Sequence, residues 1–336
     1  MSSNPHSESS VKQHNRIGVL ITNLGTPDEP TAKALRRYLK EFLWDPRVVQ
    51  IPRIIWWLIL NLLILPFRPK KSAKLYASIW TPQGSPLLVH TRNLATKLAE
   101  SLGENFVVDF AMRYGSNSID EKIKAMVANG INRLLVIPLY PQYSETTTAS
   151  TLDAVQKSLQ NLTDKPELRF LDNYHDFPEY IQACATQIKQ RCSMPDCSGN
   201  LLFSYHGLPQ SFVDKGDPYY EQCLNTSALI AKELGLKENE FFTTFQSRFG
   251  KAEWLKPYTE ETLKSLPQQG IKSIHVFCPG FSADCLETLE EIDHENRQYF
   301  IQNGGEDFQY IPALNSESIH VISLHKLIES NLDGWN

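Results

Sequence analysis

Short apolar runs alternate with amphipathic segments along almost the whole chain. Runs rich in β-branched and aromatic residues predict strands, and apolar residues spaced three or four positions apart predict helices between them. The predicted strands are residues 17–23, 106–113, 133–140, 167–171, 201–205, 241–246, 273–278 and 308–311. The predicted helices are residues 31–43, 86–102, 119–128, 147–159, 177–191, 219–234, 258–266, 284–301 and 316–332. This alternation predicts a parallel α/β fold, and four strands in each half predict two similar domains joined between residues 159 and 172.

A short motif occurs in similar form in both halves. Pro-Gln-Tyr-Ser at residues 141–144 follows the third predicted strand of the first half, and Pro-Gly-Phe-Ser at 279–282 follows the third strand of the second. Their equivalent placement favours a duplication of one half of the chain. It predicts two strand-end surfaces that face each other across a cleft.

The composition is that of a globular protein long enough for two domains. Of 336 residues, 41% are hydrophobic and 21% are charged, and the net charge of −5 argues against a nucleic-acid partner. The polar residues 1–14 predict a disordered tail rather than a signal peptide. Six cysteines without a Cys-x-x-Cys pair predict reduced thiols in a cytosolic protein. Cys192 and Cys197 fit two unrelated loop thiols better than a metal half-site.

Residues 54–67 form an unusually apolar run with cationic residues at both ends. A bilayer core needs about 20 apolar residues, so this run is too short to span it. Trp56 and Trp57 near one end fit a segment at a membrane interface or the rim of an apolar ligand cleft. A buried helix is an equal alternative.

Two features carry the chemistry. An apolar strand ends at His206, directly before a Gly, and the later helix carries Asp284, Glu287, Glu291 and Glu295 at spacings that place them on one face. Alone, each feature is more often structural, as a turn histidine or a solvated helix face. Both follow strands, however, and open α/β sheets bind ligands at strand ends. We therefore interpret imidazole and carboxylates together as a site for a divalent metal and proton transfer.

Motifs of other ligand classes are absent from the sequence. No Gly-x-Gly-x-x-Gly turn follows a strand, and there is neither a Gly-x-x-x-x-Gly-Lys-Ser/Thr loop nor a Gly-x-Ser-x-Gly turn. Other strand ends carry Arg113, Tyr114, the aromatic stretch 140–144 and Trp254. Together they predict an aromatic-walled cleft with cations at its rim, suited to a flat apolar ring that bears carboxylates.

From residue 17 to the C-terminus, the chain resembles the ferrochelatase family. The motifs that carry the resemblance are Asn-Leu-Gly-Thr-Pro at 23–27, Tyr-Pro-Gln-Tyr-Ser at 140–144, Ser-Tyr-His-Gly-Leu-Pro at 204–209, Gly-Asp-Pro-Tyr at 216–219, Phe-Gln-Ser-Arg at 245–248 and the acidic stretch 281–291. The resemblance implies a lyase that inserts Fe2+ into protoporphyrin IX, the last step of protohaem synthesis. It also implies a chelatase-like fold of two Rossmann-like domains, each with a four-stranded parallel sheet flanked by helices.

The same resemblance implies domain limits. The N-terminal domain covers residues 15–160 with a hydrophobic lip at 51–67, and the C-terminal domain covers 161–315. A C-terminal helix at 316–336 returns to the first domain. The protein is then expected to be cytoplasmic, with peripheral contact of the lip with the inner face of the membrane left open.

Roles for individual residues also follow from the resemblance. His206 and Glu287 match the metal ligands, and with Glu291 they form the expected catalytic set. The residues expected around the porphyrin are Leu24, Arg113, Tyr114, Tyr143, Trp254 and Phe281. Arg113 would steady a propionate, and the apolar residues would press the macrocycle into a bent form closer to the transition state. We expect His206 to be the first proton acceptor, although the division of labour with the carboxylates stays open.

The chain departs from parts of the family at two positions. Some members bind a [2Fe-2S] cluster through one Cys in the loop after the Tyr-Ser pair and three near the C-terminus. Glu145 occupies that loop position here and no Cys follows Cys285, so no cluster is expected. Cys285 itself stands where some members have His. Two alternatives remain, namely a cobalt or nickel tetrapyrrole chelatase and a non-catalytic porphyrin or haem carrier.

Overall fold

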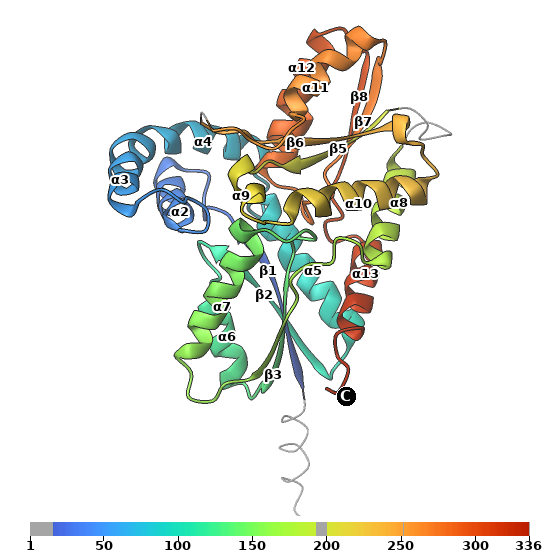
Figure 1. Ribbon diagram of the computed structural model, residues 1–336. Helices are drawn as coiled ribbons and strands as arrows, with labels where there is room; N and C mark the ends of the chain where they lie inside the picture. The colour runs from blue at the N-terminus through green and yellow to red at the C-terminus, as the bar shows by residue number, and fades with distance from the viewer. Residues whose placement is uncertain (1–15, 193–199, 251, 336) are drawn as a thin grey trace, which may run out of the picture.

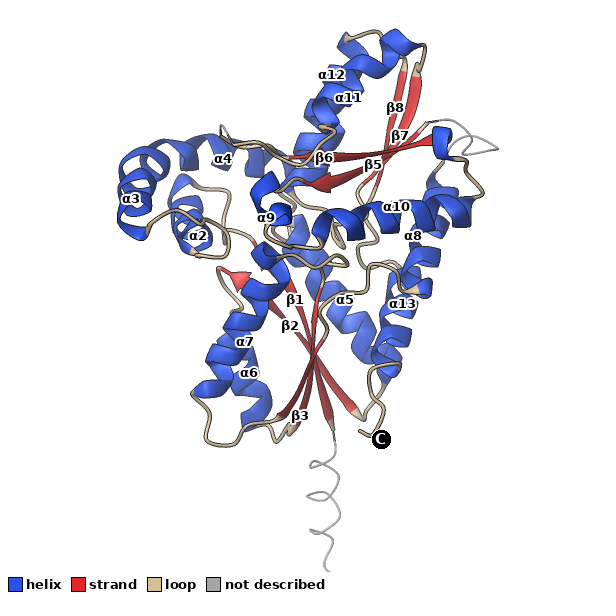
Figure 2. Ribbon diagram, viewed as in Figure 1, coloured by secondary structure: helices blue, strands red, loops and turns tan. Residues whose placement is uncertain are grey.

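Two four-stranded parallel sheets form the framework of the protein (Figure 2). The structure is a computed structural model that describes residues 16–192, 200–250 and 252–335. The sheets have the strand orders β2-β1-β3-β4 and β6-β5-β7-β8. The strands are β1 (Ile17–Gly25), β2 (Phe106–Tyr114), β3 (Arg133–Pro138), β4 (Glu167–Phe170), β5 (Leu201–His206), β6 (Phe241–Gln246), β7 (Ser273–Phe277) and β8 (Asp307–Ile311).

The predicted fold class is confirmed, because each half has a parallel sheet flanked by helices. All eight predicted strands are present, and each end lies within two residues of its prediction. The two sheets also share one strand order, in which the first strand of each half pairs with the next two along the chain. The tail predicted at residues 1–14 and Cys197 lie outside the described residues.

Every predicted helix is present, although several end in tighter or wider turns. The helical segments are α2 (Ala32–Trp44), α3 (Arg53–Leu58), η1 (Ile59–Ile64), α4 (Leu65–Ile79), α5 (Pro86–Leu102), α6 (Ile119–Ala128), η2 (Glu145–Ala149), α7 (Ser150–Gln160), α8 (Pro178–Arg191), α9 (Gln210–Asp214), α10 (Tyr219–Leu234), η3 (Glu238–Glu240), α11 (Thr259–Ser265), η4 (Leu266–Gln269), η5 (Glu287–Asn296), α12 (Arg297–Gln302) and α13 (Ser318–Glu329). The predicted helices did not include α4, α9 or η3, and a helix over residues 54–67 was only one alternative. The π-helical form of η1, η2 and η5 was not predicted.

One apolar core joins the two halves of the chain. Leu94 of α5, Cys184 of α8, Ile230 of α10 and Leu324 of α13 belong to it and are almost completely buried. Residues of both sheets belong to the same cluster, whereas α6 and α7 cover the other face of the first sheet (Figure 1). Since burial of apolar surface is the main favourable term in folding, this shared core holds the two sheets together.

The C-terminal segment packs against the first half. Helix α13 contacts α5, and the Nζ of Lys97 in α5 donates to the carbonyl of Ser316 at 2.6 Å. Beyond α13, the indole of Trp335 donates to Glu167 of β4 at 2.7 Å. Figure 1 shows α13 beside α5, with the end of the chain near the first sheet.

The two matching loops contact each other. Ser282 donates its hydroxyl to the carbonyl of Leu139 at 2.9 Å. A Cβ added to Gly280 would lie 3.4 Å from Oε1 of Gln142, so the side chain of Gln142 reaches the second loop. The strand ends of the two halves therefore face each other, as the motif predicted.

Helices α3, η1 and α4 expose a ridge of large apolar side chains. Ile54 is 82% exposed and Phe67 is 71% exposed, whereas Trp56, Leu60 and Leu65 are buried. The run is therefore helical, as one alternative predicted, but it is buried on one face alone. The remaining members of this apolar ridge are Ile55, Trp57, Leu58, Leu62 and Leu63. Among the helices described, none combines the length and hydropathy that a membrane crossing requires.

Candidate functional site

His206 is the last residue of β5 and lies opposite Gln246 of β6. Its Nδ1 lies 2.7 Å from the carbonyl oxygen of Gly207. Because a carbonyl only accepts, this contact assigns the proton to Nδ1 and leaves the Nε2 lone pair for a metal ion or a proton. A Cβ at Gly207 would lie 2.8 Å from the carbonyl oxygen of Gln246. Only glycine therefore allows the chain after β5 to pack this closely against the end of β6.

The loop after β6 holds the carboxylate of Glu291. Ser247 donates its backbone amide to one carboxylate oxygen at 2.6 Å and its hydroxyl to the other at 2.5 Å. Ser247 has a φ of 64°, a left-handed conformation that is uncommon for a residue with a Cβ. Nε2 of Gln246 donates a hydrogen bond to the carbonyl oxygen of Glu287, one turn earlier on the same helix, at 2.9 Å. The orientation of Glu291 is therefore fixed by β6 and its loop.

The surroundings of Glu291 suit proton transfer. Burial raises the pKa of its carboxyl, and the charge of Glu287 adds to this rise. The hydrogen bonds from Ser247 and the nearby His206 act in the opposite direction. A carboxylate with a raised pKa is a better proton acceptor near neutral pH than an ordinary glutamate.

Glu287 faces the first half of the chain. Burial raises the pKa of the Tyr38 and Tyr76 phenols well above their usual value, and the charge of Glu287 contributes to both rises. Burial lowers the pKa of Arg68 in α4, and the charge of Glu287 opposes this effect. Helix α4 also contacts η5. Glu287 therefore lies at the junction of the two halves, near two buried phenols and one cation.

Helix η5 does not carry the predicted ladder of four carboxylates. Its i→i+5 hydrogen bonding is rare and often marks functional sites. Glu295 lies toward the end of η5 and accepts a bond from the Tyr299 hydroxyl at 2.7 Å. Within the ladder, the charge of Glu287 contributes to the raised pKa of Glu291.

The prediction that Asp284 shares this face is wrong. Asp284 precedes the helix, is buried, and accepts hydrogen bonds from Tyr310 at 2.5 Å, Asn315 at 2.6 Å and Thr288 at 3.0 Å. Its backbone amide donates to Oδ1 of Asn315 at 2.8 Å. Asp284 therefore anchors the loop before η5 rather than joining the carboxylates of the site.

Within the described ranges, no group of three or more His, Cys, Asp or Glu side chains is arranged to hold a metal ion. His206 and Glu291 are close enough to interact electrostatically, as are Glu291 and Glu287. A divalent ion that met these side chains would need further ligands from water or from a second molecule.

The apolar residues expected around a porphyrin occupy different depths. Leu24 is half-buried against the cluster formed by α2, α3 and α4, whereas Tyr114 is 1% exposed. Phe281 is half-buried beside Leu87. Trp254 packs close to Gly207, since its Cε3 lies 3.3 Å from the Cβ position there. Of the aromatic residues expected around the porphyrin, Trp254 therefore lies directly beside the end of β5.

Arg113 and Tyr114 are held by internal partners. Arg113 forms an ion pair with Asp45 at 2.6 Å and donates Nε to the Ser150 hydroxyl at 2.8 Å. Tyr114 donates to the same carboxylate at 2.7 Å. Tyr143 lies apart from this group and donates its backbone amide to Gln222 at 2.7 Å. The charge of Arg113 is thus already compensated within the protein.

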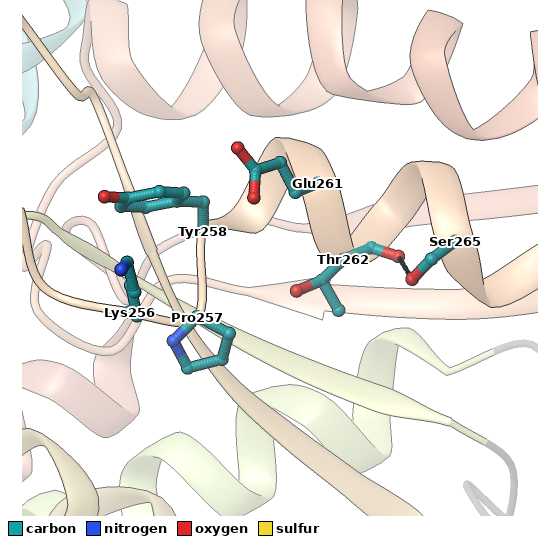
Figure 3. Close-up of a pocket in the computed structure, with 6 residues that line it drawn as sticks. All are labelled: Lys256, Pro257, Tyr258, Glu261, Thr262 and Ser265. Atoms are coloured by element: carbon teal, nitrogen blue, oxygen red, sulfur yellow. Dashed lines mark hydrogen bonds between the residues drawn. The ribbon is translucent and has the colours of Figure 1, made fainter.

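Two surface hollows lie away from His206. The larger, of about 490 Å³, is an open depression on the second half, shown in Figure 3. It is lined by Lys256, Pro257, Tyr258, Glu261, Thr262 and Ser265. The smaller, of about 200 Å³, lies between α2 and the loops after β1 and β2. Neither hollow is lined by His206, Glu287 or Glu291.

Sequence reasoning missed several contributors to the site. Tyr38, Tyr76 and Arg68 reach Glu287 from helices that are distant in sequence. Ser247 and Gln246 were part of a recognised motif, but nothing in their identity revealed that they bind Glu291. The only available signal was their position directly after a strand, where α/β sheets place functional side chains.

Comparison with known proteins identifies close relatives of this sequence. A family model described as ferrochelatase matches residues 16–332. A ferrochelatase from Idiomarina loihiensis is 55% identical over 96% of this chain and 90% of its own length. One from Alcanivorax borkumensis is 54% identical, covering 95% of each chain.

Solved structures of two other proteins share the fold. SirB from Bacillus subtilis, solved with Fe3+, has a TM-score of 0.54 at 12% identity, covering 94% of this chain and 95% of that one. CbiX, described as the terminal enzyme of sirohaem biosynthesis in denitrifying bacteria, has a TM-score of 0.52 at 13% identity, covering 94% and 99%. At such identities the likeness shows the fold alone.

Proposed function

Because this chain belongs to the ferrochelatase family, we propose that it inserts Fe2+ into protoporphyrin IX, with His206 and Glu287 as ligands of the incoming metal. Members of this family are metal chelatases of the lyase class, and their substrates are ferrous iron and a porphyrin. The observation that carries the assignment of residues is the free Nε2 of His206 near the carboxylates of η5.

The ligand set suits an ion in transit. Ferrous iron accepts both imidazole and carboxylate ligands. His206 offers one nitrogen and Glu287 one carboxylate, so the ion stays incompletely coordinated until porphyrin nitrogens complete its shell. A resident metal would be bound more completely, which fits the lack of a larger ligand cluster in the described ranges.

Two protons leave the pyrrole nitrogens as the metal enters. His206 accepts the first at Nε2, because Gly207 fixes the proton of the resting ring at Nδ1, and it passes this proton to Glu291 before the same lone pair binds the metal. Glu291 accepts the second or relays the first, since burial raises the pKa of its carboxyl. The remaining length of η5 leads toward the exposed Glu295 and offers these protons a route to solvent.

The porphyrin binds between the two halves in a bent form. A flat macrocycle holds its nitrogen lone pairs in the ring plane, so an enzyme that favours a bent ring stabilises the transition state more than the substrate. Leu24 and Phe281 approach from opposite halves, and Trp254 stands beside the His206 loop. Tyr114 supports this wall from within, and we retain Tyr143 as a further residue expected to contact the porphyrin. We retain the division into domains at residues 15–160 and 161–315, with 316–336 returning to the first, as part of the proposal.

An anaerobic insertion assay tests the function. Fe2+ insertion quenches porphyrin fluorescence, so the protein is expected to abolish the emission of protoporphyrin IX in step with haem formation. Parallel reactions with coproporphyrin, and with Co2+ or Ni2+ in place of iron, test substrate and metal preference. Tight porphyrin binding without any turnover would instead support a carrier.

We infer that the protein binds no [2Fe-2S] cluster. Glu145 replaces the loop cysteine of cluster-containing members, and no Cys follows Cys285. Burial raises the pKa of the Cys285 thiol well above its usual value, which disfavours the thiolate that a cluster needs. Protein purified without oxygen is expected to contain no acid-labile sulfide, and a stoichiometric amount of sulfide would refute this inference.

We propose that the apolar ridge contacts a membrane surface, as part of the lip at residues 51–67. Its exposed Ile, Leu, Trp and Phe side chains are followed by Arg68, Lys70 and Lys71, a combination that suits anionic headgroups. The net charge of −5 gives no reason to expect a nucleic-acid partner, so electrophoretic mobility shifts with DNA or RNA should be absent.

A further inference from the structure

Gln246 contacts the backbone beside both proposed metal ligands. It is the last residue of β6 and pairs with His206 in the strand register. Its carbonyl oxygen accepts the backbone amide of Gly207, the residue after His206, at 2.8 Å. Its side-chain Nε2 donates to the carbonyl oxygen of Glu287 at 2.9 Å. This one residue, which is 3% exposed, therefore joins the end of β5 to the first residue of η5.

The hydrogen-bond partners fix the orientation of the Gln246 amide. The Glu287 carbonyl only accepts, so the amide nitrogen faces η5, where it also lies 3.4 Å from Oε2 of Glu291. The amide oxygen then faces two buried donors. The Ser204 hydroxyl donates to it at 2.7 Å, and the Sγ of Cys278 lies 3.7 Å away. A rotated amide would place its oxygen against the Glu287 carbonyl and leave buried polar groups unpaired, which is costly.

A cluster of buried hydroxyls supports Ser204. The hydroxyl of Thr259, at the start of α11, lies 2.8 Å from that of Ser204 and 2.8 Å from that of Thr244. Thr244 in turn donates to the carbonyl of Phe203 at 3.1 Å. Because this cluster is buried and ends on the backbone of β5, it holds the Ser204 hydroxyl in the position from which it binds Gln246.

The tie to Gln246 bears directly on the presentation of Glu287. Glu287 opens η5, and a backbone fixed to the sheet presents its carboxylate from a fixed origin. Groups behind a metal ligand orient it, and their loss typically lowers metal affinity or activity about 10- to 100-fold. The same tie sets the spacing between His206 and Glu287, which an incoming divalent ion has to span.

We propose that Gln246 is a positioning residue that sets the distance between His206 and Glu287, and that Ser204 acts through it by orienting its amide. This inference rests on the proposed function and adds to it two residues that act through the metal ligands. Without the amide, the Glu287 carbonyl loses its tie to β6 and the first turn of η5 is free to shift.

Gln246→Met tests this role, because it keeps the length of the side chain and removes its donors. The KM for Fe2+ in anaerobic insertion is expected to rise about tenfold. The Kd for protoporphyrin IX, measured by quenching of tryptophan fluorescence, should stay unchanged. Hydrogen–deuterium exchange of a peptide covering residues 287–296 should become faster, since the end of η5 is less firmly held.

A double-mutant cycle tests the dependence on Ser204. Ser204→Ala is expected to raise the KM for Fe2+ by a smaller factor than Gln246→Met, because the amide stays in place but loses its strongest acceptor contact. In the Gln246→Met background, Ser204→Ala should have no further effect on this KM. Independent, additive effects of the two substitutions would show that Ser204 does not act through Gln246.

Thr244→Val provides the matched control. It removes another hydroxyl from the same buried cluster, so it should lower the thermal stability but leave the KM for Fe2+ and the exchange of η5 unchanged. Equal effects of Thr244→Val and Gln246→Met, or unchanged exchange of η5 in Gln246→Met, would overturn the inference. A parent protein that inserts no iron would instead refute the proposed function, and the exchange comparison would still decide whether Gln246 holds η5.

Discussion

Ser247 binds both oxygens of the Glu291 carboxylate, through its backbone amide at 2.6 Å and its hydroxyl at 2.5 Å. These bonds stabilise the ionised form and so limit the rise in pKa that burial of Glu291 causes. The loop after β6 thereby sets both the orientation of this carboxylate and the pH range in which it accepts a proton. Ser247 keeps a left-handed backbone conformation to do so.

Ser247→Ala is expected to move the acidic limb of the pH profile to higher pH. Removal of the hydroxyl donor takes away a contact that lowers the pKa of Glu291, so this carboxyl holds its proton to higher pH and cannot accept another. The measurement is kcat/KM for iron insertion against pH. Ser247→Gly should shift the limb in the same direction while tolerating the positive φ better.

Glu291→Gln supplies the control for that assignment. It removes the titrating group, so a limb that belongs to Glu291 should disappear in this variant. A limb that persists at the parent's position in Glu291→Gln would show that another group titrates there.

Asp284→Ala is expected to destabilise the fold strongly. The substitution leaves the Tyr310 hydroxyl and the Asn315 amide buried without their acceptor, and each such loss costs roughly 1–3 kcal/mol. We predict a decrease of about 3–5 kcal/mol in the free energy of unfolding, measured by urea denaturation. Asp293→Ala is the control, because its ion pair with Arg297 is partly exposed and should contribute about 1 kcal/mol or less. A small effect at Asp284 would contradict its role as an anchor.

Ile54→Ser combined with Phe67→Ser is expected to weaken membrane binding. Both side chains are largely exposed, so burial in a lipid interface would supply most of their transfer free energy. Co-sedimentation with phosphatidylglycerol vesicles should fall by at least about tenfold, with the far-ultraviolet circular dichroism spectrum unchanged. Ile322→Ser, which alters an exposed residue of α13, should bind vesicles like the parent. Equal binding by all three proteins would exclude the apolar ridge as the contact surface.

The strands and most helices could be predicted because their signals are local. Each strand is a short apolar run bounded by turn residues, as at His206, where Gly207 closes β5. The family's motifs then brought His206, Glu287 and Glu291 into one hypothesis. Their electrostatic interaction in the structure is consistent with that hypothesis and does not itself test their roles.

Other parts of the site depend on tertiary structure that sequence patterns do not encode. The sequence pattern predicted that the helix begins at Asp284, but Asn315 from a distant loop holds Asp284 outside it. A helical spacing of 3.6 residues also cannot foresee the π-helical turns of η5. The approach of Tyr38 and Tyr76 to Glu287 arises only when the two halves pack together.

The central claim is that the Nε2 of His206 acts on iron and on a pyrrole proton, and His206→Ala tests it most directly. Anaerobic iron insertion by this variant, followed by loss of protoporphyrin IX fluorescence, should fall at least about a hundredfold, with the Kd for the porphyrin little changed. His325→Ala, which alters an imidazole on α13, should retain the parent's activity. Turnover at the parent's rate in His206→Ala would contradict the account.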